Sequence, residues 1–200
     1  LIVMPESCCY PVPRDLSIDD AVLCEPLSIG LYAVKGSIPL ERAAAGVIGA
    51  GPIGLSVLLS AGAYGCERSY VSDPVPARSR AAEDNGAAWA GAPKELDEAV
   101  RQGEPDLLDV AFECSGTQEG LDQALRLLKP GGKLMIIGIP EFDRFEFDAH
   151  TARRHEITLQ NVRRQNECVD ESMELVAAGK IDPSFMKTHE FRLDEAPRAF

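Results

Sequence analysis

The sequence has no cysteine pair with the spacing of a metal or redox motif. Its six cysteines include no C-x-x-C pair and follow no regular spacing. Dense disulfides are typical of small secreted domains, and a chain of this size can bury a core without them. Hydrophobic residues make up 45% of the chain, which is enough for such a core. We therefore expect reduced cysteines and a cytoplasmic location.

The sequence also lacks a long apolar run and an excess of basic residues. No run reaches the roughly 18 apolar residues of a membrane helix, and there is no signal-peptide pattern. The formal net charge is −12. Nucleic acids and anionic membrane surfaces both attract basic faces, so we expect neither as a partner. The charge places no limit on small-molecule partners.

Both ends of the sequence look like internal positions of a longer chain. The first residues, LIVMPES, include no initiating methionine at position 1, and the last residues, DEAPRAF, have the pattern of a helix. We expect this chain to be an excerpt from a longer protein.

Short apolar runs alternate regularly with helical patterns over the middle of the chain. The runs predict strands at residues 43–48, 69–72, 88–90, 107–113 and 133–139. The helical patterns predict helices at residues 19–35, 52–64, 76–85, 94–102 and 119–128. Continuous apolar strands that alternate with helices are typical of a parallel sheet covered on both faces. The predicted fold is therefore α/β, a Rossmann-type doubly wound parallel sheet.

The alternation weakens in the last third of the chain. Residues 144–150 alternate like an edge strand and would present Phe145 and Phe147 on one face. Residues 156–162 read as another strand and residues 168–178 as a helix. An unpaired strand edge invites pairing with a second copy, so we expect a homodimer through the edge near the two phenylalanines.

The stretch GVIGAGPIG at residues 46–54 carries the pattern G-x-G-x-x-G between a predicted strand and a predicted helix. In that context the first glycine permits a tight turn, the second lets backbone approach a diphosphate, and the third lets helix and strand pack closely. The start of the helix supplies free N–H groups and a partial positive charge. The predicted dinucleotide-contacting residues of this segment are Gly49, Gly51, Pro52, Ile53 and Gly54.

Asp73 ends the second predicted strand, 19 residues after Gly54. A carboxylate at this spacing binds the two hydroxyls of an adenosine ribose and repels a 2′-phosphate, which favours NAD over NADP. Arg78 is close enough in sequence to interact with the cofactor and weakens that preference. Two alternatives remain open: Asp73 could cap the next helix, or the site could hold S-adenosylmethionine in a methyltransferase.

Several longer stretches together resemble one family, the medium-chain zinc-dependent alcohol dehydrogenases, and within it the sorbitol (polyol) dehydrogenase branch. They are CEPLSIGLYAV (24–34), GAGPIGL (49–55), ECSG (113–116), LKPGGKLMIIG (128–138), NVRRQN (161–166) and GKIDPSFMKTHEFRLDEAPRAF (179–200). The resemblance implies an NAD-dependent dehydrogenase that transfers hydride between a secondary alcohol or polyol and the nicotinamide.

The resemblance also implies a division of the protein into a GroES-like catalytic domain and a cofactor domain. The zinc-binding Cys and His-Glu motifs of the family are not in this sequence. We expect residues 1–24 to border the catalytic domain, 25–166 to form the cofactor domain with its linking helix, and 167–200 to return towards the catalytic domain. Short remnants of the GroES-like domain would thus lie at both ends.

This division leaves the function of the isolated chain open. We expect it to bind NAD without turnover, with zinc present only in the full-length protein. The alternatives are a cofactor-binding module or apo scaffold without catalytic activity, or a threonine or other alcohol dehydrogenase of the same family.

The resemblance implies catalytic roles for Glu25 and Arg163. Glu25 matches a family glutamate at or near the catalytic zinc, and it could ligate zinc only together with the absent Cys and His ligands. Arg163 matches an arginine that lines the cleft, and Arg164 replaces a tyrosine of animal polyol dehydrogenases. Without the resemblance, Glu25 could be a helix-start carboxylate and the RRQN segment an ordinary solvated turn.

Two short segments follow predicted strands at the edge of the sheet where ligands bind. We expect their backbone groups to face the nicotinamide half of the cofactor. They contain Cys114, Ser115, Gly116, Gly138 and Ile139. We expect Cys114 to be a small buried residue rather than a nucleophile. The three histidines have no ligand-like spacing.

Overall fold

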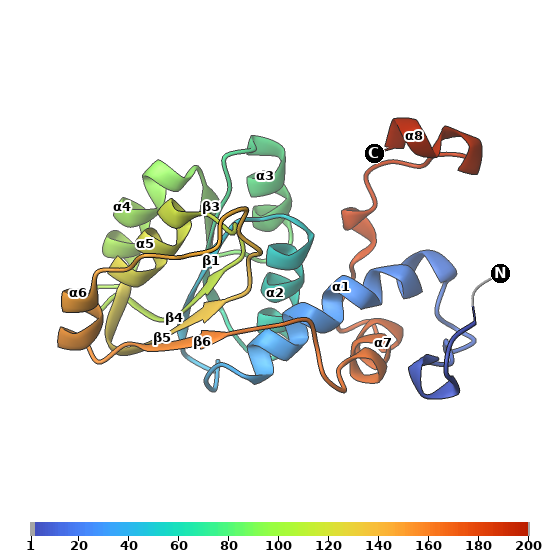
Figure 1. The fold of residues 1–200 in the computed structure, drawn as a ribbon, viewed down its shortest axis with the longest axis horizontal. Helices are drawn as coiled ribbons and strands as arrows, with labels where there is room; N and C mark the ends of the chain where they lie inside the picture. The colour runs from blue at the N-terminus through green and yellow to red at the C-terminus, as the bar shows by residue number, and fades with distance from the viewer. Residues whose placement is uncertain (1–2, 200) are drawn as a thin grey trace.

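The chain folds around one six-stranded parallel sheet (Figure 1). The computed structural model describes residues 3–199, so Leu1, Ile2 and Phe200 lie outside the described residues. The strands are β1 (Ala44–Ile48), β2 (Arg68–Ser72), β3 (Trp89–Gly91), β4 (Leu108–Glu113), β5 (Leu128–Ile136) and β6 (Thr158–Asn161). Their order is β3-β2-β1-β4-β5-β6 and every neighbouring pair is parallel. The predicted doubly wound parallel sheet is confirmed.

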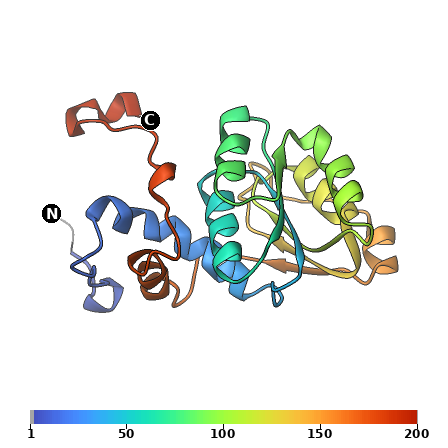
Figure 2. The same cartoon turned by 180° about the vertical axis from the view of Figure 1, so that it is seen from behind.

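Helices cover both faces of this sheet, as the alternation predicted (Figures 1 and 2). The helices are α1 (Ile18–Lys35), α2 (Pro52–Ala63), α3 (Pro76–Asp84), α4 (Pro93–Gly103), α5 (Gln118–Arg126), α6 (Ala149–Arg154), α7 (Val169–Ala177) and α8 (Ala196–Ala199). Short 3₁₀ turns lie at Glu6–Cys8, Ser184–Met186 and Leu193–Glu195. The first described residues and helix α8 both lie on the side of the molecule occupied by α1 and α7, away from α6 (Figure 1).

The core consists of two apolar layers, one on each face of the sheet. Helices α1, α2 and α3 cover one layer, which includes Val47 and Phe112. Helices α4, α5 and α6 cover the other, which includes Ile48 and Leu134. Successive strand residues point to opposite faces, so a sheet covered on both faces needs apolar residues at every strand position. The continuous apolar runs in the sequence reflect this requirement.

Helix α1 begins slightly earlier than predicted because Ser17 caps it. The Ser17 hydroxyl accepts a hydrogen bond from the backbone N–H of Asp20 at 3.0 Å, which satisfies one free donor of the first turn. Asp19 and Asp20 add favourable negative charge there. The helix continues through Pro26 to Lys35 and packs against α2 and α7.

The predicted strand at residues 144–150 was wrong. Residues 144–148 form a loop. Helix α6 begins at Ala149 because the Asp148 carboxylate accepts hydrogen bonds from the backbone N–H groups of His150 and Thr151. The Gln118 side chain pairs with the backbone of Glu146, donating to its carbonyl and accepting from its N–H at 3.0 Å. A side chain therefore replaces the strand partner that this segment was expected to offer.

The correction removes the structural basis for the predicted dimer contact. Phe145 is half-buried against the core and stacks edge-on with Phe142, with ring centroids 5.1 Å apart, while Phe147 is exposed. The two aromatic residues therefore do not share one packed face, because only Phe145 contacts the core. The outer strand on this side of the sheet is β6. A homodimer stays a prediction, but not one formed by pairing at residues 144–150.

Strand β5 begins before the Pro130-Gly131-Gly132 segment that was expected only to end a helix. Leu108 pairs with Leu128, whereas Val110 pairs with Lys133, so the register shifts between these two positions. The proline and the two glycines lie between these paired positions, in the irregular part of the strand. The helix ends at Arg126, two residues earlier than predicted, and the strand ends at Ile136 rather than at residue 139.

Helix α7 is held to α1 and α2 by a three-residue polar cluster. Glu171 accepts hydrogen bonds from the Lys35 ammonium of α1 and from the Tyr64 hydroxyl at the end of α2. These two hydrogen bonds, that of Lys35 first, lower the pKa of Glu171 below its ordinary value. The cluster therefore stabilises the folded state while Glu171 is ionised.

We expect Glu171→Gln to lower the free energy of unfolding by about 1 kcal/mol at pH 7, a small value because both charged partners are partly exposed to solvent. A carboxyl group whose pKa falls on folding contributes stability above its unfolded pKa of about 4.3 and loses it at lower pH. The difference between variant and parent should therefore shrink as the pH falls from 7 towards 3. Urea denaturation at several pH values measures it.

Glu174→Gln is the matched control, because Glu174 is exposed on the same helix and makes no ion pair among residues 3–199. It should unfold within about 0.5 kcal/mol of the parent chain. An equal loss of stability in the two variants would contradict the assigned role of Glu171.

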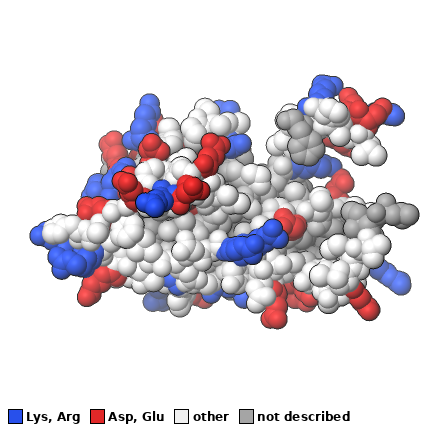
Figure 3. All heavy atoms as spheres, in the orientation of Figure 1, with Lys and Arg blue, Asp and Glu red and all other residues white. Residues whose placement is uncertain are grey.

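Charged side chains do not form a single large basic patch on the face drawn in Figure 3. Acidic and basic residues are interspersed there, and much of the surface between them is uncharged. Within residues 3–199, no helix is both long enough and apolar enough to cross a membrane.

Candidate functional site

The candidate site lies where the strand order reverses. Strand β1 is followed in sequence by β2 on one side, whereas β4 pairs with β1 on the other side. The connections from the two strands therefore leave in opposite directions and open a crevice beyond their carboxyl ends. Ile48 of β1 pairs with Glu113 of β4, so the glycine loop and the ECSG segment meet at this edge.

The glycine loop turns sharply from β1 into α2. Gly49 has φ +97°, a left-handed conformation that favours glycine, and its N–H donates to the Ser72 carbonyl at 2.8 Å. Helix α2 then begins at Pro52, with Gly51 as its N-cap and no side-chain cap. Its first N–H groups are therefore available for an anionic ligand.

Asp73 sits at the carboxyl end of β2 and faces this loop. One carboxylate oxygen accepts from the Ala50 N–H at 2.9 Å, and the other accepts from the Val75 N–H at 2.8 Å. Arg78 approaches the first oxygen at 3.7 Å and remains half exposed. The carboxylate thus braces the glycine loop and the entry to α3. The contact with the Val75 N–H resembles the helix cap considered from the sequence, because it satisfies a backbone donor at the start of α3. The N-cap residue of α3 is nevertheless Val75 and not Asp73.

A cavity of about 340 Å³ opens beside Asp73, which we call the Asp73 pocket. Its wall joins the glycine loop, the end of β2, the start of α4 and the start of α5. The lining residues are Ile48, Gly49, Gly51, Ser72, Asp73, Pro74, Arg78, Pro93, Cys114, Ser115, Thr117, Glu119, Gly120 and Gln123.

A second cavity, of about 630 Å³, lies on the other side of Cys114 and Ser115. We call it the Arg163 pocket. Its lining combines aliphatic side chains with two arginines at the end of β6. The lining residues are Ile29, Ile53, Cys114, Ser115, Ile137, Gly138, Ile139, Val162, Arg163 and Arg164. Both volumes fall within the range of ordinary small-molecule sites.

Glu113 holds the segment that separates the two pockets. This fully buried carboxylate accepts from the backbone N–H groups of Ser115 and Gly116, both at 2.8 Å, and from the Ser115 hydroxyl at 2.5 Å. Its other oxygen has no hydrogen-bond partner and lies beside Gly138. A side chain at Gly138 would meet that oxygen. Glu113 therefore fixes the loop after β4 close to the loop after β5.

Cys114 lies at the junction of the pockets but is poorly suited to act as a nucleophile. Burial, followed by the nearby Glu113 charge, raises the pKa of its thiol far above the ordinary value. A thiol that stays protonated at neutral pH is a weak nucleophile. The high thiol pKa argues against a nucleophilic role for Cys114, although its side chain is only partly buried and borders both pockets.

Most predicted site residues gather at this crevice, with some differences in role. Gly49, Gly51, Asp73 and Arg78 line the Asp73 pocket. Ile53, Gly138, Ile139 and Arg163 line the Arg163 pocket, and Cys114 and Ser115 line both. Pro52, Gly54 and Gly116 shape the loops without lining either cavity.

Glu25 does not line either pocket. It is exposed on α1, one helical turn before Ile29 of the Arg163 pocket. Within the described part of the chain, no three histidine, cysteine or acidic residues come together as a metal-binding group. Glu25 and its neighbours in this chain therefore do not form a zinc site by themselves.

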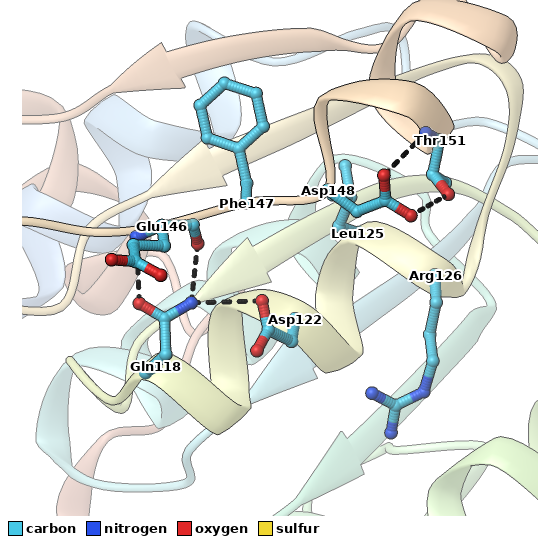
Figure 4. A pocket seen from close by; sticks show the side chains of 8 residues that line it. All are labelled: Gln118, Asp122, Leu125, Arg126, Glu146, Phe147, Asp148 and Thr151. Carbon is cyan, nitrogen blue, oxygen red and sulfur yellow. Dashed lines mark hydrogen bonds between the residues drawn. The ribbon is translucent and has the colours of Figure 1, made fainter.

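A third, more open cavity of about 480 Å³ lies away from the crevice, between α5, α6 and the loop before α6 (Figure 4). Its polar groups are largely engaged with one another. The Gln118 side chain bonds Glu146 and Asp122, and Asp148 bonds Thr151. The Arg126 guanidinium pairs with Asp97. This cavity shares no residue with the pockets at the strand ends.

Sequence reasoning missed three contributors to the site. Glu113 stood out as a carboxylate at the end of an apolar strand but was not assigned a bracing role. Thr117 caps α5, accepting from the Gly120 N–H at 3.0 Å, and its residue type before a helix was an available signal. Gln123 lines the Asp73 pocket from within α5, and no local pattern indicated this.

Comparisons with known proteins agree with this geometry. The sequence profile of a family described as "Zinc-binding dehydrogenase" matches residues 52–178. The chain is 27% identical to an L-idonate 5-dehydrogenase of Vitis vinifera over 201 residues, covering 97% of the chain and 55% of that protein. It is 28% identical to a sorbitol dehydrogenase of Bacillus subtilis (strain 168), covering 99% of the chain and 57% of that protein.

A solved structure has the same fold over most of the chain. It is a putative zinc-binding dehydrogenase from Sinorhizobium meliloti 1021 bound to NADP, with a TM-score of 0.86 and 28% identity, covering 95% of this chain and 57% of that one. The chain thus spans little more than half the length of the relatives it matches.

Proposed function

The chain belongs to the zinc-binding dehydrogenase family, and on that premise we propose that it is the NAD(H)-binding half of an alcohol or polyol dehydrogenase. The whole protein would transfer hydride between a secondary alcohol and the nicotinamide. One observation carries the proposal: the glycine loop, the Asp73 pocket and the Arg163 pocket form adjoining compartments at the strand-order reversal. A dinucleotide needs two such compartments with a phosphate-binding loop between them.

The residues at the crevice suit NAD(H). Gly51 presents bare backbone at the start of α2, with open space where a Cβ would stand. Asp73 offers a fixed carboxylate for ribose hydroxyls, held by Ala50 and Val75. The aliphatic wall of the Arg163 pocket suits the face of a nicotinamide ring. Bound NAD would supply a hydride acceptor, and this chain would bind it, orient it and exclude water.

We propose NAD rather than NADP as the preferred cofactor, because a carboxylate in the Asp73 position repels a 2′-phosphate. Arg78 opposes that preference, since it lies 3.7 Å from the carboxylate and is half exposed. The similar structure bound to NADP shows that the choice varies among related folds. Asp73 and Arg78 together would therefore set a moderate rather than an absolute preference.

We expect Asp73→Ala to weaken NADH binding about 30- to 100-fold, because two charge-assisted hydrogen bonds to the ribose would be lost. NADPH binding should weaken much less, so that the preference disappears. Calorimetric titration of parent and variant with both cofactors measures this. Urea denaturation should accompany it, because Asp73 also accepts two backbone N–H groups.

Asp84→Ala is the matched control, because it removes an exposed carboxylate from the end of α3 without touching the pocket. Its NADH and NADPH affinities should equal those of the parent. Tighter binding of NADPH than NADH by the parent chain would overturn the proposed preference. Failure of both cofactors to bind would overturn the proposal that this chain binds cofactor alone.

Catalysis by zinc would need residues beyond those of this chain. Within residues 3–199 only isolated candidate ligands such as Glu25 are present. We propose that Glu25 contributes to a zinc site, directly or through water, only when Cys and His ligands are supplied by the rest of the protein. The second candidate function is therefore a cofactor-binding module without turnover. Joining this chain to the family's Cys and His-Glu segment and measuring NADH production from NAD⁺ and polyols with zinc distinguishes the two.

A further inference from the structure

Gln123 is a buried glutamine that borders the Asp73 pocket from the second turn of α5. The residue is only 5% exposed. A polar side chain that is removed from water to this extent needs hydrogen-bond partners, either from the protein or from a ligand. The partners that Gln123 has within the protein therefore show which of its groups is left for a ligand.

The nitrogen end of the Gln123 amide is fully used within the protein. Nε2 donates to the Pro93 carbonyl oxygen at 2.7 Å and to the Asp97 carboxylate at 2.6 Å, which uses both of its hydrogens. Burial acts to raise the pKa of Asp97, but hydrogen bonds from Arg126 and Gln123 outweigh it and hold this pKa below its ordinary value. A carbonyl and an ionised carboxylate only accept hydrogen bonds, so the amide cannot turn round.

The oxygen end of the same amide is left without a partner. Oε1 accepts no hydrogen bond from residues 3–199, yet it is not fully enclosed by them, unlike the free oxygen of Glu113. The open space that Gln123 borders is the Asp73 pocket. The wall of this pocket therefore carries one acceptor of fixed direction, on a side chain that is otherwise buried and satisfied.

The position of Gln123 indicates which part of a dinucleotide it would meet. We assign the diphosphate to the glycine loop and the adenosine ribose to Asp73, at the end of β2. The base attached to that ribose would then lie in the rest of the same pocket, whose wall includes Pro93 and Gln123. Pro93 offers an apolar surface for the face of a base, and Gln123 offers an acceptor for its edge.

A fixed acceptor distinguishes purines by the group at position 6. Adenine carries an amine there, which donates hydrogen bonds, whereas guanine and hypoxanthine carry a carbonyl, which only accepts them. Two acceptors that face each other both stay without a partner, and the cost is highest for the one that is buried. A site built to bond one polar group therefore rejects an analogue that lacks it.

We propose that Gln123 is a specificity-determining residue that accepts a hydrogen bond from the 6-amino group of the cofactor's adenine, and that Asp97 is a positioning residue that holds the Gln123 amide in place. This inference rests on the proposed function and deepens it, because a glycine loop can bind a dinucleotide without any contact to the edge of the base. Glu119 is a competing acceptor in the same pocket, but it is exposed to water and loses little when a ligand offers no donor.

The test compares NADH with reduced nicotinamide hypoxanthine dinucleotide, in which a carbonyl replaces the 6-amino group. Fluorescence titrations of the chain measure both affinities, and we expect NADH to bind about tenfold more tightly. Gln123→Met keeps an unbranched side chain without the acceptor, and it should reduce this ratio to about twofold or less. Asp97→Ala should reduce the ratio in part, because the amide can then turn. Asp97 does not line the pocket, so this variant remains a test if Gln123→Met does not fold.

Gln102→Met is the matched control, because Gln102 is exposed on α4 and lines none of the three cavities described above. It should keep the preference for NADH. Equal affinities of the parent chain for the two dinucleotides would overturn the inference. Tighter binding of the hypoxanthine form would also overturn it, since the acceptor would then face the N–H at position 1 of hypoxanthine. So would a preference that is lost in Glu119→Gln but kept in Gln123→Met, because Glu119 would then read the base.

Titrations with AMP and IMP, followed by saturation-transfer NMR, separate this inference from the proposed function. The two mononucleotides differ in the same group at position 6 and carry no nicotinamide. If NADH does not bind but AMP binds more tightly than IMP and loses this advantage in Gln123→Met, the proposed function fails for this chain and the inference stands. If NADH binds and neither pair of ligands shows a preference, the proposed function stands and the inference fails. Failure of AMP and NADH alike to bind would overturn both.

Discussion

Replacing Gly51 with valine is expected to leave the domain folded and to weaken NADH binding by about a hundredfold. Gly51 has φ −71° and ψ −176°, which other residues adopt without strain, and a Cβ there would meet no atom within 4 Å. That open space faces the approach to the α2 start, where we place the diphosphate. A branched side chain would occupy it and keep the phosphates from the helix N–H groups.

NADH fluorescence titration together with urea denaturation measures both parts of this prediction. The free energy of unfolding should change by no more than about 1 kcal/mol, because only the helix N-cap preference is affected. Gly62→Val is the matched control, since Gly62 lies in the last turn of the same helix and also has open space around it. Its NADH affinity should equal that of the parent. Unchanged NADH binding by Gly51→Val would show that the loop is not the phosphate site.

Gly54→Ala is expected to have the opposite profile, with a large loss of stability. A Cβ at Gly54 would stand 1.8 Å from the Gly49 carbonyl oxygen and 2.9 Å from its carbonyl carbon. Both atoms belong to backbone that is fixed by the turn into α2, so the clash cannot be relieved by rotating a side chain. We expect the free energy of unfolding to fall by about 3 kcal/mol, at the upper end of the usual cost of overpacking.

Thermal unfolding followed by circular dichroism measures this loss. A domain of this size should melt about 10 °C lower for a 3 kcal/mol change. Gly62→Ala should instead melt at or slightly above the parent temperature, because alanine is the better residue in an exposed helical position. A Gly54→Ala chain that melts within about 2 °C of the parent would refute the close approach of helix and loop.

Together these two variants separate the roles of neighbouring glycines in one motif. Gly51 would serve the ligand and Gly54 the fold. NADH binding should be lost in both, but only in Gly54→Ala should the loss accompany unfolding. A motif that was merely structural would not produce an intact Gly51→Val domain with weak cofactor binding.

The parallel sheet and the glycine loop could be predicted because each depends on residues close in sequence. The apolar run of β1 leads directly into three glycines and α2, and β2 leads directly into Asp73. Strand period, glycine spacing and helix caps all act over a few residues. The fold class and the glycine loop were therefore accessible from the sequence.

The segment at residues 144–150 shows why similar reasoning failed elsewhere. The alternating pattern predicted one packed face of a strand, but only Phe145 packs against the core and Phe147 is exposed. Here the backbone partner is the Gln118 side chain, 28 residues earlier in the chain. Local sequence could not indicate that a side-chain amide, rather than another strand, would pair with Glu146.

The sequence by itself determined the strand–helix alternation, the glycine loop, the acid after β2 and the resemblance to a dehydrogenase family. Only the tertiary structure decided that Cys114 and Ser115 divide two pockets, that Asp73 braces Ala50, and that Arg163 and Arg164 line a cavity without carboxylates. The physical reason is parallel pairing. It brings Ile48 of β1 beside Glu113 of β4, although β2 and β3 lie between them in the sequence. Such contacts depend on the packing of the whole sheet rather than on neighbouring residues.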